Sequence, residues 1–140
     1  MASFFVSRLD SVIDALLEES IRNGNKDLEG LLGKAAIANA KLAYRDFKAI
    51  FGNAAFTALK EKGARVQRPL WASTGTKNPA YSDVLYQDSL IGPDTVNTVP
   101  PATLTAFVDH GRAANTLDQD VDEAQSAMQA LADAGINIDL

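Results

Sequence analysis

Apolar residues recur along the chain with two different periods, which predict strands that alternate with helices. Short apolar and β-branched runs at 3–6, 65–72 and 95–99 are typical of buried strands, although Pro69 can donate no hydrogen bond within the second run. After each run, apolar residues recur every three or four positions, as on one face of a helix. The predicted helices cover 9–23, 26–51, 53–62, 78–85, 104–110 and 117–134, and the second is either continuous or broken near Gly30 or Gly33.

The order of these elements is strand, helices, strand, helix, strand and two helices. Strands that alternate with helices pair in parallel through right-handed crossovers, so the sequence predicts an α/β fold, either a sheet or a barrel. Three strands make a small sheet with two unpaired edges, whereas a barrel closes its edges. We therefore expect that further strands complete the sheet or that the chain self-associates through the open edges.

Composition indicates one globular domain without thiol chemistry. The chain has 140 residues, of which 46% are hydrophobic and 22% charged, as is typical of folded soluble proteins. It has no cysteine, which excludes disulfides and thiolate sites and is compatible with a cytoplasmic location. No apolar run approaches the ~18 residues of a membrane span, and the N-terminus lacks the pattern of a signal peptide. The net charge of -5 argues against general nucleic-acid binding, so any phosphate site must be small and local.

Two loops that follow predicted strands carry groups suited to a phosphate. In parallel α/β folds the working loops follow the carboxyl ends of the strands. Ser3 lies on the first strand and Arg8 just beyond its end, and a guanidinium can donate two parallel hydrogen bonds to a phosphate. The segment 73–78 after the second strand combines hydroxyls, a glycine, a predicted helix N-terminus and Lys77. These loops predict a phosphate cradle, but a surface ion pair of Arg8 and a loop that only caps a helix would give the same pattern.

Other candidate residues have simpler structural interpretations. The loop at 97–101 brings an amide and a hydroxyl to the same edge, where Thr98 is expected to cap the following helix. His110, the single histidine, falls in the last turn of a helix, where a positive charge is favourable. The acidic residues at 118–122 lack the glycine and the glutamate that a calcium loop requires. The lysine-rich side of the helix at 34–48 is interpreted as a solvated face.

Four segments of the chain resemble the transaldolase family. They are SFFVSRLD at 3–10, GKAAIANAK at 33–41, RVQRPLWASTGTKNP at 65–79 and DTVNTVP at 94–100. The similarity is to the C-terminal half of bacterial transaldolases, of the group that also occurs fused to glucose-6-phosphate isomerase. It spans nearly the whole chain, and the segment 71–79 is its most specific part.

The resemblance implies a (β/α)8 barrel (TIM barrel) of the class I aldolase type, in which the three strands are the sixth, seventh and eighth. Residues 1–140 are then expected to be the C-terminal part of one barrel domain, with the first five strands and a final helix outside the chain. Transaldolases of the pentose phosphate pathway transfer a dihydroxyacetone unit from sedoheptulose 7-phosphate to glyceraldehyde 3-phosphate, giving erythrose 4-phosphate and fructose 6-phosphate. The reaction proceeds through a Schiff base on a lysine and uses neither a metal nor an organic cofactor. The implied partners are therefore phosphorylated sugars.

The resemblance also implies roles for individual residues. The residues that would hold the substrate phosphate are Ser3, Arg8, Ser73 and Lys77. Many transaldolases have an arginine where this chain has Lys77, which keeps the charge but not the bidentate fork. The residues expected to line the cavity are Phe5, Trp71 and Asn97. For Trp71, a place in the core is the alternative.

No catalytic residue is expected in this chain. In the family, the Schiff-base lysine belongs to the fourth strand and the acid/base carboxylates to the first and third. A lysine nucleophile needs desolvation or a cationic neighbour to lose its proton, and the lysines of the predicted solvated face offer neither. We therefore expect the isolated chain to be inactive. The alternatives are a module that only binds sugar phosphates and a structural half-barrel.

Overall fold

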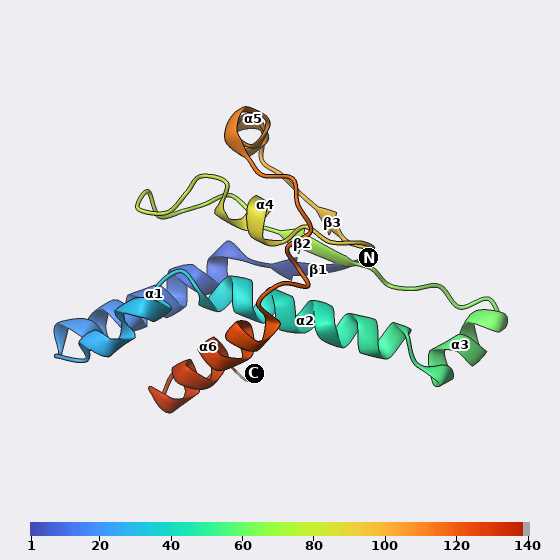
Figure 1. Cartoon of the computed structure of the whole chain (residues 1–140), viewed down its shortest axis with the longest axis horizontal. Helices are drawn as coiled ribbons and strands as arrows, with labels where there is room; N and C mark the ends of the chain where they lie inside the picture. The colour runs from blue at the N-terminus through green and yellow to red at the C-terminus, as the bar shows by residue number, and fades with distance from the viewer. Residues whose placement is uncertain (139–140) are drawn as a thin grey trace.

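The computed structural model describes residues 1–138 and shows helices that alternate with three short strands (Figure 1). The strands are β1 (Ala2–Phe5), β2 (Pro69–Ala72) and β3 (Val96–Asn97). The helices are α1 (Ser7–Arg22), the 3-10 helix η1 (Lys26–Leu31), α2 (Ala35–Phe51), α3 (Ala54–Glu61), α4 (Leu85–Ser89), α5 (Pro101–His110) and α6 (Val121–Asp133). This order confirms the predicted α/β class. Within residues 1–138, none of the helices is long and apolar enough to cross a membrane.

The strands form one parallel sheet in the order β1, β2, β3. Phe4 of β1 lies beside Trp71 of β2, which lies beside Asn97 of β3. Because parallel strands run in one direction, the loops that follow their carboxyl ends lie at one edge of the sheet, here called the carboxyl edge. Within residues 1–138, β1 and β3 each pair on one side only, so both outer strands are open for pairing.

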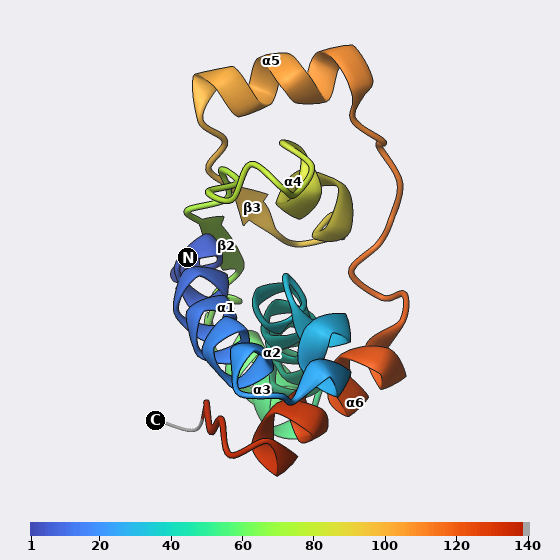
Figure 2. The same cartoon turned by 90° about the vertical axis from the view of Figure 1, so that its left-hand side faces the viewer.

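The two faces of the sheet are covered differently. Phe4 and Trp71 point to the helix side, where their rings meet edge to face with centroids 5.6 Å apart. The hydrophobic core lies on this side of the sheet. Its buried residues are Val6, Ala36, Ala40, Tyr44, Trp71, Tyr86, Leu90 and Leu117. Figure 2 shows α2 and α4 on the same side of the sheet. Successive strand residues point to opposite faces, and Phe5, which follows Phe4, is 51% exposed. The face that carries Phe5 is here called the open face.

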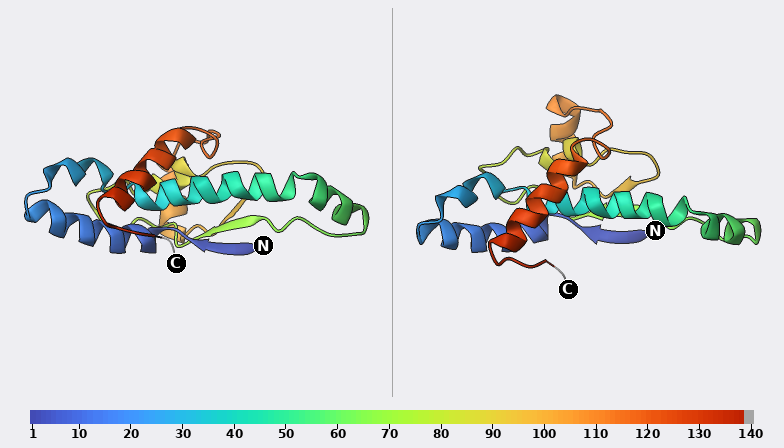
Figure 3. Two further views of the ribbon diagram at one scale, coloured as in Figure 1. Left: turned by 90° about the horizontal axis from the view of Figure 1, so that it is seen from below. Right: turned by 60° about the horizontal axis from the view of Figure 1, so that its bottom comes forward.

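A second apolar cluster joins α6 to the first two long helices. Ile13 and Leu17 of α1 meet Ala35 of α2 and Leu131 of α6 in this cluster. Figure 3 shows α6 lying across α2. The helix predicted over 117–134 is thus confirmed from Val121 onward, with Leu131 and Met128 on its packed face. Residues 117–120 form turns and bends instead, and Leu117 is buried in the core beside the sheet.

The prediction of a fully solvated lysine-rich face on α2 is wrong at one position, because the segment just before α6 packs against this face. The basic residues of that face are Lys34, Lys41, Arg45 and Lys48. Lys41 is only 8% exposed, and its Nζ donates a hydrogen bond to Gln119 O at 2.7 Å. The other three are exposed. The contact joins residues that lie far apart in the sequence, so the periodicity of α2 alone did not reveal it.

The predicted helix over 26–51 is broken at Gly33, which is one of the two alternatives that the sequence left open. Gly33 has a φ of +67°, and a Cβ at this position would lie 2.9 Å from Cζ of Tyr81. The Gly33 N–H donates to Asp14 Oδ1 at 2.9 Å. Glycine suits both the backbone conformation and the close approach of the ring, so α2 begins only at Ala35.

The prediction that Asn78 and Pro79 open a helix is wrong. Residues 78–84 form turns and bends, and α4 begins at Leu85. Asn78 Oδ1 accepts a hydrogen bond from the Ala80 N–H at 2.9 Å. An N-cap makes the same bond, but here the bond closes a turn that no helix follows. Tyr81 then directs its hydroxyl to Asp14 Oδ2 at 2.6 Å. The segment 73–84 is therefore a loop, here called the 73–84 loop.

Thr98 does not cap α5, contrary to the prediction. Its Oγ1 donates to Trp71 O at 3.1 Å and its N–H to the same oxygen at 3.0 Å. Both bonds extend the contact between β3 and β2. The N-terminus of α5 follows Pro100 and has no side-chain cap. Pro69 is the first residue of β2, a position where a strand tolerates a missing N–H.

Candidate functional site

The loops that follow β1 and β2 are joined by backbone hydrogen bonds at the carboxyl edge. The Val6 N–H donates to Ala72 O at 2.9 Å, and the Ser7 N–H donates to Ser73 O at 3.0 Å. These bonds extend the pairing of β1 and β2 beyond the strand ends and into the first turn of α1. As the parallel arrangement predicted, the segment that contains Arg8 therefore lies beside the start of the 73–84 loop.

Arg8 is exposed in the first turn of α1. Its guanidinium carbon lies 4.6 Å from the centroid of the Phe5 ring. This cation–π contact holds the guanidinium by its face and leaves its N–H groups available at the edge. Within residues 1–138 Arg8 forms no ion pair with a carboxylate, so the alternative of a surface ion pair is not observed there.

The first residues of the 73–84 loop are fixed by side chains beneath them. Thr74 is fully buried, and its Oγ1 donates to Asn97 Oδ1 at 2.8 Å. The Thr74 carbonyl accepts from Gln87 Nε2 at 2.9 Å. Ser73 has a φ of +54°, a left-handed conformation that costs energy for a residue with a side chain. The surrounding bonds hold this conformation, which leaves Ser73 half-buried and Lys77 exposed.

The structure divides the residues selected from the sequence into two groups. The group at the carboxyl edge or on the open face consists of Ser3, Phe5, Arg8, Ser73 and Lys77. The other two lie on the helix side: Trp71 is 1% exposed in the core, and Asn97 lies beside it and holds Thr74. The position of Trp71 agrees with the core alternative rather than with the wall of an open cavity.

Two aspartates that the sequence analysis did not select link α1 to the elements around the loop. Asp10 is 2% exposed and Asp14 is 7% exposed. Asp10 Oδ1 accepts from the Ala36 N–H at 2.8 Å, and its Oδ2 accepts from Tyr86 Oη at 2.6 Å. Asp14 binds the Gly33 N–H and Tyr81 Oη in the same way, one helical turn further along α1. Their spacing on the face that also carries Ile13 and Leu17 was the available signal, because an acidic residue on an apolar stripe usually has buried partners.

Burial raises the pKa values of Asp10 and of the two phenols in these contacts. Desolvation raises the pKa of Asp10 above its usual range and outweighs the hydrogen bonds from Tyr86 and Ala36. Desolvation also raises the pKa values of Tyr81 and Tyr86, and each rises further because its hydroxyl bonds to an aspartate. Both phenols are therefore protonated donors at neutral pH. They hold the 73–84 loop and α4 against α1.

A cavity of about 240 Å³ opens between α1 and the 73–84 loop. Its lining includes Lys77 and Tyr81 from the loop and Ser7, Asp10 and Asp14 from α1. The hydroxyl of Ser7 is buried and has no hydrogen-bond partner within residues 1–138. Within that range, no group of three or more histidine, aspartate or glutamate side chains is placed to hold a metal ion.

The sequence matches the family described as Transaldolase/Fructose-6-phosphate aldolase over residues 1–140. It is 52% identical over 146 residues to Transaldolase 2 of a Nostoc species and 48% identical over 145 residues to the transaldolase of Trichodesmium erythraeum. Each alignment covers 100% of this chain and 38% of the relative. The transaldolase of Mycolicibacterium smegmatis is 50% identical over 139 residues, which cover 99% of this chain and 37% of that protein. The chain thus spans well under half the length of these relatives. It belongs to the transaldolase/fructose-6-phosphate aldolase family.

Proposed function

We propose that the chain supplies the phosphate-binding part of a transaldolase site, with Ser3, Arg8, Ser73 and Lys77 around the terminal phosphate of the sugar. The observation that carries this proposal is the joining of the two loops at Ser7 and Ser73. It brings the segments of Arg8 and Lys77 to one edge, and neither side chain forms an ion pair within residues 1–138. A phosphate there would accept charge-assisted hydrogen bonds from both cations.

In this proposal β1, β2 and β3 are the sixth, seventh and eighth strands of a (β/α)8 barrel whose other strands lie outside this chain. The parallel order, the open face and the outer strands, which within residues 1–138 pair on one side only, support this arrangement, because every strand of a closed barrel pairs on both sides. Edge-to-edge pairing with a second copy of the chain is the alternative way to cover β1 and β3.

The proposed reaction transfers a dihydroxyacetone unit from sedoheptulose 7-phosphate to glyceraldehyde 3-phosphate in the cytoplasm, through a Schiff base on a lysine outside this chain. The nucleophilic amine must be unprotonated, which requires desolvation or a cationic neighbour. Lys34 and Lys48 are exposed on α2. Lys41 is buried, but its Nζ is bound to Gln119 O where the segment before α6 meets α2. These lysines therefore do not provide the amine at the carboxyl edge, where Lys77 acts as the phosphate cation.

Replacing Arg8 by alanine is expected to weaken the binding of fructose 6-phosphate about tenfold or more, because a hydrogen bond to a charged group contributes roughly 1.5–3 kcal/mol. Calorimetric titration of the full chain measures the dissociation constants. Arg22→Ala is the matched control, since it removes the same side chain from the opposite end of α1 and should leave the affinity unchanged. Equal binding by the wild type and Arg8→Ala, or no binding by the wild type at millimolar sugar phosphate, would contradict the proposal.

The chain by itself is expected to form no Schiff base with fructose 6-phosphate. The physical reason is that Lys41 is bound to a carbonyl and the other six lysines are exposed to solvent. Borohydride reduction followed by mass spectrometry would detect the secondary amine that a trapped adduct leaves on a lysine. A stoichiometric mass increase that maps to one lysine would show that this chain carries the nucleophile.

A further inference from the structure

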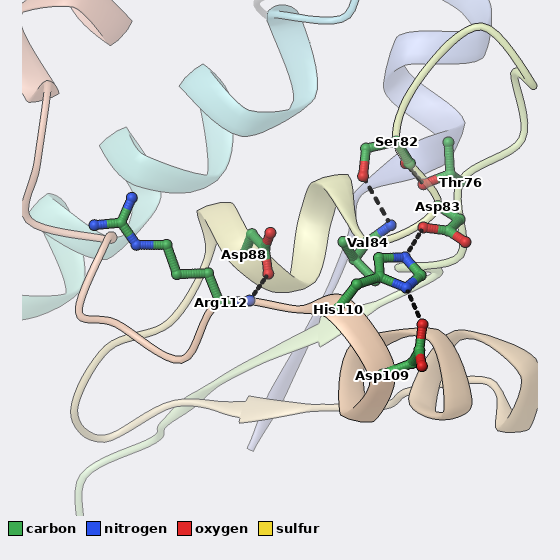
Figure 4. A network of polar contacts seen from close by, with 8 residues as sticks. All are labelled: Thr76, Ser82, Asp83, Val84, Asp88, Asp109, His110 and Arg112. Carbon is green, nitrogen blue, oxygen red and sulfur yellow. Dashed lines mark hydrogen bonds and ion pairs between the residues drawn. The ribbon is translucent and has the colours of Figure 1, made fainter.

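His110 makes two contacts to carboxylates at the end of α5, as Figure 4 shows. Its Nε2 lies 2.7 Å from Asp83 Oδ1, and its Nδ1 lies 3.0 Å from Asp109 Oδ2. Asp109 precedes His110 on α5, whereas Asp83 belongs to the 73–84 loop. One ring therefore connects the C-terminus of α5 to the loop that follows β2.

The geometry requires a particular protonation state of this ring. An ionised carboxylate only accepts hydrogen bonds, so both ring nitrogens must carry a proton for both contacts to form. The hydrogen bond to Asp83, and next the one to Asp109, raise the pKa of His110 above its usual value. The C-terminal end of α5 favours the same positive charge. The charged groups nearby are Asp88, whose Oδ1 accepts from the Arg112 N–H at 2.8 Å, and the Arg112 guanidinium, which points away from the ring (Figure 4).

The residues that His110 holds are tied to the first half of the loop. Thr76 Oγ1 donates to Ser82 O at 2.7 Å, and Ser82 is adjacent to Asp83. Thr76 is likewise adjacent to Lys77. At the other end of α5, a Cβ at Gly75 would lie 3.3 Å from Cγ of Pro100. The loop therefore contacts both ends of α5. Gly75 packs closely against Pro100 at the N-terminal end, and Asp83 contacts His110 at the C-terminal end.

We propose that His110 in its imidazolium form is a positioning residue that fastens the 73–84 loop to α5 and so places Ser73 and Lys77 for phosphate binding. Loss of one ring proton removes the hydrogen-bond donor of one of the two contacts, so either Asp83 or Asp109 loses its hydrogen bond to the ring. The Tyr81–Asp14 contact persists, because the pKa of that phenol is raised. The loop therefore stays folded but becomes less restrained as the pH rises through the His110 titration. The fastening stands on this geometry alone, whereas the effect on phosphate rests on the proposed function.

The first test is the titration of the ring itself. His110 is the only histidine, so its ring signals in nuclear magnetic resonance are unambiguous. We expect a midpoint above the ordinary value of about 6.5, and amide signals of Thr76, Ser82 and Asp83 that move with the same midpoint. Asp83→Asn should lower this midpoint, whereas Asp118→Asn, which removes an exposed carboxylate paired with Lys48, should not. An ordinary midpoint that Asp83→Asn leaves unchanged would overturn the proposal.

The second test separates the fastening from the phosphate site. The dissociation constant of fructose 6-phosphate is compared between the wild type and His110→Gln at each pH, because the ratio cancels the titration of the phosphate itself, whose second pKa is about 6. On the acid side of the His110 midpoint, we expect the dissociation constant of His110→Gln to be roughly three times that of the wild type. On the alkaline side, the two dissociation constants should be nearly equal. A ratio of one at every pH would show that His110 does not position the site. Absence of sugar phosphate binding at any pH would reject the proposed function and leave the ring titration to decide the fastening.

Discussion

Replacing Trp71 by alanine is expected to lower the free energy of unfolding by about 3–5 kcal/mol, the range for large aromatic residues removed from a core. The indole is 1% exposed and lies edge to face against Phe4, in the cluster that joins the sheet to α2 and α4. Truncation at this position leaves a cavity between the sheet and its covering helices. Urea unfolding followed by far-ultraviolet circular dichroism measures the change, because Trp71 is the only tryptophan and its fluorescence is lost in the variant.

Phe5→Ala is the matched control for this prediction. Phe5 is an aromatic residue of the same sheet, but it lies on the open face and is 51% exposed. Its truncation removes the contact with Arg8 and is expected to cost less than about 1 kcal/mol. If Phe5→Ala destabilised the chain as much as Trp71→Ala, the open face would have to be packed in solution, against a second copy for example.

Local periodicity predicted the order of the elements and the place of the loops, because both depend on residues close together in the sequence. The parallel strands required that the segments of Arg8 and Ser73 lie at one edge, and the backbone bonds there agree. The break at Gly33 and the turns at Asn78 were less predictable. Gly33 contacts Asp14, which lies 19 residues before it, and the loop that contains Asn78 is held to the same aspartate through Tyr81, 67 residues away. A local pattern typical of a helix start, such as Asn78 followed by proline, carries no information about such long-range contacts.

The residues of the candidate site were likewise predictable only where their placement does not depend on long-range contacts. Arg8 and Lys77 could be selected from the sequence, because an exposed cation after a strand needs no buried partner. Trp71 could not be placed, because strand alternation alone does not say which face the helices cover. For His110, the sequence predicted only the favourable position of a positive charge at the end of a helix. Its contact with Asp83 was not predicted, because Asp83 lies in a loop that the sequence predicted as a helix. Errors in the loop therefore propagated to the residues that the loop contacts.

Replacing Asp10 by alanine is expected to lower the free energy of unfolding by about 3 kcal/mol. The change leaves the Ala36 N–H and the Tyr86 hydroxyl buried without their acceptor, and each unsatisfied buried group costs roughly 1–3 kcal/mol. Tyr86→Phe in the same background removes one of the two orphaned donors. The double variant should therefore be less destabilised than the sum of the single variants, as urea unfolding can measure. An Asp10→Ala variant no less stable than Asp46→Ala, which removes an exposed carboxylate, would show that these bonds contribute nothing.

The pH dependence of the Asp10→Asn variant tests the electrostatic part of this contact. Because burial raises the pKa of Asp10 in the folded chain, the folded state binds the proton more tightly than the unfolded state does. The contribution of this group to stability is then fully present below its ordinary pKa and is lost as the pH rises through the folded value. Asparagine does not titrate, so the stability difference between the wild type and Asp10→Asn should be most favourable to the wild type in acid and should diminish with rising pH. A difference that instead grew in favour of the wild type as the pH rose would mean that the hydrogen bonds from Tyr86 and Ala36 outweigh desolvation and lower the pKa of Asp10.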